Sequence, residues 1–84
     1  MTTEASEIQV AVLAFGQVAE RLGGRRHQLE VHRGISIEDL VRTLGLEEWI
    51  TFGLSVALNG ERCPMDTVLN EACEVALLPP VSGG

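Results

Sequence analysis

The sequence has few basic residues, few cysteines and no long apolar run, and each shortage excludes a class of protein. Lys and Arg together number 6 against 12 Asp and Glu, which gives a formal net charge of −6 at pH 7. A nucleic-acid-binding domain needs a basic face to displace phosphate counterions, so this class is excluded. We expect instead that the acidic surface meets a basic protein partner, because opposite fields speed encounter.

The two cysteines, Cys63 and Cys73, are too few for the disulfide framework of a small secreted domain. We interpret them as free structural thiols, since neither lies in a C-x-x-C pair or beside a His; a mutual disulfide and a reactive role are the alternatives. The polar stretch Met1–Glu7 lacks the basic and apolar segments of a signal peptide. No apolar stretch approaches the ~20 residues of a membrane helix. The sequence therefore predicts a cytoplasmic protein without membrane contact.

The residues that are present fit one small folded domain. The chain has 84 residues, of which 45% are hydrophobic and 21% are charged. A domain of this length buries roughly two thirds of its unfolded surface, so its core is modest. We expect no room for both a large core and a deep enzymatic cavity.

Alternating apolar residues predict four main strands. Their ranges are 8–15, 28–32, 54–58 and 73–78. Asn59 and Gly60 both tolerate positive φ, so they predict a type I′ hairpin with a short return strand over 61–63. Pro64 lacks the N–H that a strand ladder needs, which places this return strand at a sheet edge.

One strong helix is predicted after Ser36, whose hydroxyl can cap the first turn together with Asp39. Gly45 supplies a left-handed end. The apolar stripe that follows helical spacing consists of Ile37, Leu40, Val41 and Leu44. A shorter helix is predicted over 17–22 and one helical turn over 66–69, with a connector over 46–53.

This order of elements predicts an α+β fold. A mixed sheet of about five strands around one main helix, the β-grasp arrangement, buries every apolar face. The first and last strands are the most apolar, so we expect them side by side and parallel in the centre. We expect a polar N-terminal extension over 1–7, the β-grasp domain over 8–78 and an extended tail over 79–84.

No catalytic set emerges from the motifs. His27 and His32 are interpreted as solvated polar residues near a strand's ends, and a metal site would need further ligands converging on one point. The glycines at Gly23 and Gly24 lack the spacing of a phosphate-binding loop. We expect no metal and no stably bound cofactor, so a partner would have to hold any nucleotide.

The unusual feature is the tail that follows the last strand. Pro79 and Pro80 favour an extended backbone, and the six residues from Pro79 to Gly84 can reach about 20 Å at ~3.3 Å per residue. Gly83 and Gly84 have no Cβ, so a narrow active-site channel can close around them. The alternative is a frayed end without function. We favour a functional tail whose reactive group is the Gly84 carboxylate.

The tail sequence Pro-Pro-Val-Ser-Gly-Gly resembles the PPV-[AST]-GG end of the family of molybdopterin synthase small subunits. The segment from Leu13 to Gly23 is similar to the same family's N-terminal motif, an apolar strand followed by a short helix that ends in Gly. The resemblance covers roughly Ile8 to Gly84. Arg62 departs from it, because an apolar contact residue is common at that position.

The resemblance implies a non-catalytic, sulfur-donating subunit. An ATP-dependent adenylating enzyme would form a transient acyl-AMP at Gly84, and a sulfur donor protein would convert it to a thiocarboxylate. The tail would then enter the large synthase subunit, within a heterotetramer, and donate sulfur for the molybdopterin dithiolene. The catalytic side chains would belong to the partner. The inserted tail residues would be Pro79, Pro80, Val81, Ser82 and Gly83.

The resemblance also implies an interface on the exposed sheet face, at Phe15, Arg62 and Leu78. For Phe15 and Leu78, core packing is the alternative.

Other functions stay open. The chain could carry sulfur for thiamine thiazole or cysteine synthesis, or be a ubiquitin-like modifier joined to lysines through Gly84. A plain binding module is a further alternative, and it would not require activation at Gly84.

Overall fold

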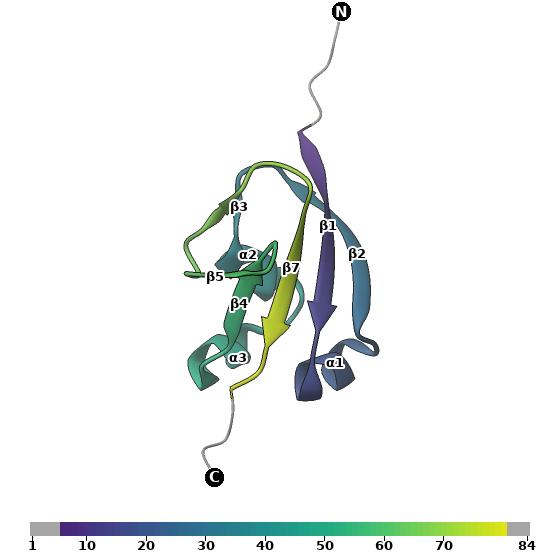
Figure 1. Cartoon of the computed structure of the whole chain (residues 1–84), viewed down its shortest axis with the longest axis vertical. Coiled ribbons are helices and arrows are strands. Elements are labelled where there is room, and N and C mark those ends of the chain that lie inside the picture. Colours follow the sequence, from purple (N-terminus) through teal and green to yellow (C-terminus); the bar gives the residue numbers. More distant parts are fainter. Residues whose placement is uncertain (1–5, 81–84) are drawn as a thin grey trace, which may run out of the picture.

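A five-stranded mixed sheet forms the centre of the computed structural model, which describes residues 6–80 (Figure 1). The strand order is β2-β1-β7-β4-β5. The strands are β1 (Glu7–Ala14), β2 (Arg26–His32), β4 (Ser55–Leu58), β5 (Glu61–Cys63) and β7 (Cys73–Leu78). The predicted β-grasp arrangement is confirmed.

The strands that come first and last along the sequence, β1 and β7, lie side by side and parallel in the sheet, as predicted. Their inward-facing side chains alternate with outward-facing ones, so the burial of residues follows a period of two. On the inward face, Val10, Val12, Val75 and Leu77 are all 0% exposed. This face of the central pair of strands forms one side of the hydrophobic core.

Helix α2 (Ile37–Thr43) covers this inward face of the sheet. The Ser36 Oγ accepts a hydrogen bond from the Asp39 N–H at 3.1 Å, so the predicted cap is present. A cap of this kind stabilises a helix by about 1 kcal/mol. The apolar stripe of α2 is buried in the core through Ile37, Leu40 and Val41.

The hairpin at Asn59 and Gly60 also matches its prediction. Both residues have positive φ, at 50° and 89°, and the strands that they join, β4 and β5, are antiparallel. Helix α1 (Gly16–Leu22) ends at Gly23, which adopts the left-handed conformation at φ 80°. It begins one residue before the predicted helix.

Two local predictions were wrong. The connector over 46–53 contains helix α3 (Glu47–Phe52), which has two Glu in its first turn and ends at the left-handed Gly53. Acidic residues stabilise the positive end of a helix. Trp49 and Ile50 also pack against the core, so tertiary burial stabilises this short helix.

The second error concerns 66–69, where the structure has strand β6 (Val68–Leu69) in place of a helical turn. β6 pairs with β3 (Ile35–Ser36) in a small antiparallel sheet. The carbonyls of Met65 and Thr67 accept hydrogen bonds from the first N–H groups of α2, at 2.9 and 2.8 Å. These N–H groups have no partner within the helix, and satisfying them favours an extended segment here.

Among residues 6–80, no helix is long and apolar enough to cross a membrane.

Candidate functional site

The site residues predicted from the sequence fall into two groups. Phe15, Arg62, Leu78, Pro79 and Pro80 are described by the structure. The other predicted tail residues, Val81, Ser82, Gly83 and Gly84, lie outside the described residues. The geometry available is therefore that of the domain where the tail begins.

Strand β7 leads directly to the base of the tail. It ends at Leu78, between α1 and α3 (Figure 1). Pro79 is half-buried and Pro80 is exposed. A Cβ built on Gly16, at the start of α1, would lie 3.1 Å from the Cγ of Pro79, and one built on Gly53 would lie 3.7 Å from the Cβ of Pro80. The two prolines thus rest between α1 and the end of α3.

The outward face of the sheet carries a continuous row of residues that crosses all five strands. In the strand register, Leu13 of β1 pairs with both Arg26 of β2 and Ala76 of β7, and Ala57 of β4 pairs with both Ala76 and Arg62 of β5. Three apolar residues therefore lie between two arginines. The outer strands are about 19 Å apart, at ~4.8 Å per strand step.

The next row toward the tail contains Leu78, which pairs with Ser55, and beside it Phe15, which directly follows β1. Leu78 and Phe15 are half-buried, so core packing does not account for all of their surface. With the three apolar residues of the neighbouring row they form the tail-end patch, whose members are Leu13, Phe15, Ala57, Ala76 and Leu78. The structure therefore brings the predicted residues Phe15 and Leu78 together beside the tail.

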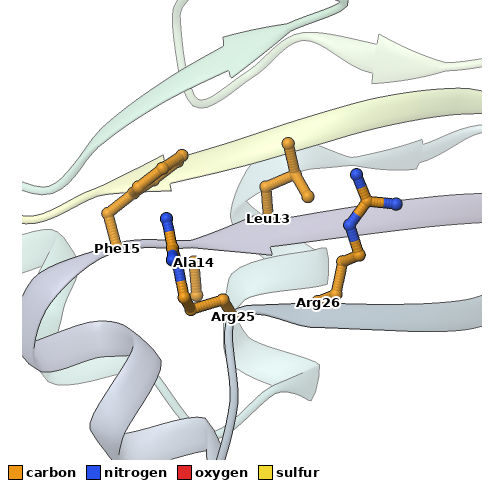
Figure 2. A pocket seen from close by; sticks show the side chains of 5 residues that line it. All are labelled: Leu13, Ala14, Phe15, Arg25 and Arg26. Atoms are coloured by element: carbon orange, nitrogen blue, oxygen red, sulfur yellow. The ribbon is translucent and has the colours of Figure 1, made fainter.

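The guanidinium groups around this patch lack acidic partners within the domain. Leu13, Ala14, Phe15, Arg25 and Arg26 line a pocket of about 290 Å³ (Figure 2). Figure 2 shows the Arg26 side chain on the same side of β1 as Leu13. Neither the Arg25 nor the Arg26 guanidinium has an ion-pair or hydrogen-bond partner among residues 6–80. The Arg62 Nη2 donates a hydrogen bond to the Ser55 Oγ at 3.0 Å.

The half of the same face that lies farther from the tail has a different character. The Gln9 Nε2 donates to the Glu30 Oε2, and the Gln28 Nε2 donates to the Gln9 Oε1, both at 3.2 Å. Polar side chains here satisfy one another. The chain's net charge of −6 therefore does not describe the local charge around the tail-end patch, which arginines flank on both sides.

Sequence reasoning missed Leu13, Ala57, Ala76 and Arg26 as members of this surface. Alternation along each strand places them on the outward face, and that signal was available. Their assembly into one row depends on the register between strands that lie far apart in the sequence, which no local pattern specifies.

The titratable residues do not form a catalytic group. The His27 Nε2 is 3.0 Å from the Gly24 carbonyl oxygen, within a local turn. Burial, and to a smaller extent the charge of Glu71, raises the pKa of the Cys73 thiol. A raised pKa disfavours the thiolate that a nucleophilic cysteine needs, which supports a structural role for Cys73.

Comparison with known proteins agrees with this architecture. A model of the ThiS family matches residues 12–84. The Haloferax volcanii protein HVO 2177 superposes with a TM-score of 0.81 at 21% identity, over 100% of this chain and 93% of that chain. No curated protein matches the chain by sequence.

Two further solved structures are similar. Small archaeal modifier protein 1 from Haloferax volcanii has a TM-score of 0.70 at 28% identity, over 90% of this chain and 99% of that chain. A Pyrococcus furiosus protein provisionally assigned as molybdopterin converting factor subunit 1 has a TM-score of 0.72 at 21% identity, over 88% and 99% of the two chains. The fold that they share with this chain is the ubiquitin-like β-grasp.

Proposed function

The chain belongs to the ThiS family of ubiquitin-like sulfur carriers, and from this premise we propose that it carries sulfur for molybdenum cofactor biosynthesis as a thiocarboxylate at Gly84. The observation that carries the proposal is the tail, whose Pro-Pro-Val-Ser-Gly-Gly sequence follows a central strand and lies within the family match. The similarity to the Pyrococcus furiosus protein supports the molybdopterin branch.

A carboxylate reacts poorly with nucleophiles, and the chemistry proposed for Gly84 overcomes this by activating it. The carboxylate oxygen attacks the α-phosphorus of ATP in the adenylating partner, and pyrophosphate leaves. The acyl-adenylate has AMP as a good leaving group. Hydrosulfide (HS⁻) delivered by the donor protein then attacks the acyl carbon, the C–O bond to AMP breaks, and loss of the remaining proton leaves the thiocarboxylate. ATP is thus a substrate of the partner, and this chain contributes the acyl group.

The domain's own contribution is to present the tail. The tail-end patch provides apolar surface beside the start of the tail, and burying such surface drives association. Arg26 and Arg62 flank it at the two sheet edges, so we propose a partner surface with an apolar centre and carboxylates on both sides. The adenylating enzyme and the large synthase subunit would use this patch in turn, in the cytoplasm.

Intact-mass measurement tests the proposal. The chain is incubated with ATP, a sulfur donor and the cognate adenylating enzyme. We expect a mass gain equal to the exchange of one oxygen for sulfur, and no gain for the matched variant that lacks Gly83 and Gly84. An unchanged mass with a competent enzyme, or full sulfur-transfer activity of the shortened variant, would refute the carrier function. Complementation of strains that lack either the molybdopterin or the thiazole carrier then decides the pathway.

Protein modification is the second candidate, because small archaeal modifier protein 1 shares 28% identity with this chain. The 84 residues contain no Lys, since all six basic residues are Arg. In a conjugate made through Gly84 to a lysine, that lysine would therefore belong to another protein. Digestion of cell extract and a search for Gly84 linked to lysine peptides would favour this function if such peptides are found.

A further inference from the structure

Two glycines from distant parts of the sequence lie beside the two prolines at the base of the tail. Gly16 has φ +58°, and a Cβ at this position would lie 3.1 Å from the Cγ of Pro79. Gly53 has φ +101°, and a Cβ there would lie 3.7 Å from the Cβ of Pro80. Each glycine thus forms one side of the passage through which the chain leaves the domain.

Turn geometry alone does not account for these contacts. Four other glycines, Gly23, Gly34, Gly45 and Gly60, also have positive φ, which glycine adopts readily because it has no Cβ. A Cβ added to any of these four would meet no heavy atom within 4 Å. Gly16 and Gly53 differ because the space that a side chain would need there is close to the tail.

The two prolines restrict the backbone conformation with which the chain leaves the domain. The ring of Pro79 fixes its own φ, and Pro80 restricts the backbone of Pro79 to extended conformations. The rings of Pro79 and Pro80 therefore leave the domain beside Gly16 and Gly53 in a restricted backbone conformation. Figure 1 shows the end of β7 between α1 and α3. Gly16 is the first residue of α1, and Gly53 directly follows α3.

We propose that Gly16 and Gly53 are positioning residues that set the direction in which the tail leaves the domain. This inference rests on the proposed function, because a directed tail matters only if a partner receives it. The tail-end patch binds the partner, and the two glycines align Gly84 with the partner's active site. Gly16 has the larger role, since a Cβ at 3.1 Å forces Pro79 to move by a few tenths of an ångström. A Cβ at 3.7 Å is in ordinary contact.

The test compares Gly16→Ala with Gly45→Ala. Both variants place a Cβ on a residue with positive φ, so both carry similar backbone strain, but Gly45 at φ +78° has open space around it. The first readout is the NMR chemical shifts of the Pro79 ring. We expect them to change in Gly16→Ala and to stay the same in Gly45→Ala.

The second readout is adenylation kinetics with the cognate adenylating enzyme. A small misplacement of a reacting group lowers the rate of the chemical step without weakening the docking surface. For Gly16→Ala we expect kcat to fall about threefold to tenfold while KM for the carrier changes less than about twofold. Gly45→Ala should retain the kcat of the unsubstituted chain.

A double-mutant cycle identifies Pro79 as the contact that matters. Gly16→Ala should lower kcat less when Pro79 is also replaced by Ala, because the ring that the new Cβ displaces is gone. Equal losses with and without the Pro79 ring would overturn the proposal. Identical kcat for the two glycine variants, or Pro79 shifts that do not respond to Gly16→Ala, would also overturn it. If the unsubstituted chain is not adenylated at all, the proposed function fails, whereas the Pro79 shifts still decide whether Gly16 sets the exit.

Discussion

The two faces of the central sheet carry apolar residues for different reasons. On the inward face they are buried beneath α2. The exposed fraction is 0% for Val10, Val12, Val75 and Leu77. On the outward face most of those in the tail-end patch are only partly buried, although Ala57 is 8% exposed. The same strands carry Gln9 and Glu30 farther from the tail, where polar groups bond to one another. Folding therefore demands the first apolar set and leaves the second free to serve a partner.

Adjacent residues on β7 provide the largest test of this difference. Leu77 faces the core and is 0% exposed, whereas Leu78 faces outward and is half-buried. We expect Leu77→Ala to lower the free energy of unfolding by about 2–5 kcal/mol, because it leaves a cavity. Leu78→Ala should lower it by about 1 kcal/mol or less. Urea unfolding of both variants measures this, and similar losses would mean that Leu78 is a core residue.

A polar substitution in the middle of the tail-end patch gives the next largest effect. Ala76→Asp places a carboxylate at the centre of the apolar row, where partner binding would bury it without a counter-charge. We expect the dissociation constant for the adenylating enzyme to rise at least about tenfold, which corresponds to ~1.4 kcal/mol. Titration calorimetry measures it.

Ala11→Asp is the matched control for that experiment. Ala11 is also half-buried on the outward face, but it pairs with Gln28 and Glu74 in the polar half. The new carboxylate beside Glu74 makes this variant the less stable of the two on electrostatic grounds. If it nevertheless binds the enzyme normally, lost stability cannot explain the effect at Ala76. Equal weakening by both variants would instead extend the docking surface over the whole face.

The comparison of faces also shows what the sequence could predict. Strand alternation, the cap at Ser36 and the hairpin at Asn59 are local signals, and each of them predicted its element correctly. β6 was missed because its stabilising contacts, to β3 and to the first N–H groups of α2, come from distant segments. A local pattern does not report such contacts.

The candidate site divides in the same way. The tail and two outward apolar residues, Phe15 and Leu78, were available from motifs. The contact between Gly16 and Pro79 joins the two ends of the domain, so only the parallel pairing of β1 with β7 reveals it. The local charge was also hidden, because the summed charge of −6 averages over surfaces that differ in sign.

Removing one flanking charge should have a smaller effect, mainly on association rate. Arg62→Gln removes a positive charge at the edge of the tail-end patch, and charges at the rim of an interface act chiefly by steering. We expect the association rate constant with the adenylating enzyme to fall about twofold to fivefold at low salt and the difference to shrink at high salt. Stopped-flow fluorescence measures these rates.

Arg42→Gln is the matched control, since it removes the same charge from α2, where the Arg42 Nη2 lies 2.7 Å from the Glu38 Oε2. Its association rate should be unchanged. A decrease as large as that of Arg62→Gln would show that the total charge of the chain, and not its position, governs encounter.

The smallest expected effect concerns Cys73 at the margin of the inward face. Its partial burial, with a further contribution from Glu71, raises the pKa of this thiol above its ordinary value of 9.0, so the fold favours the neutral form. A group whose pKa is higher in the folded than in the unfolded state stabilises the fold below the unfolded pKa. That stabilisation is lost as the pH rises through the folded pKa. The free energy of unfolding, relative to that of Cys73→Ala, should therefore be constant near neutral pH and decline above about pH 9. Urea unfolding of both chains across this range measures the difference. The titration of the groups that both chains share cancels in it, and the loss of sulfur packing adds only a constant offset. If this difference in the free energy of unfolding rises with pH, the inward face tolerates a charged thiolate at its margin. The inward and outward faces would then differ less than the burial of Cys73 indicates.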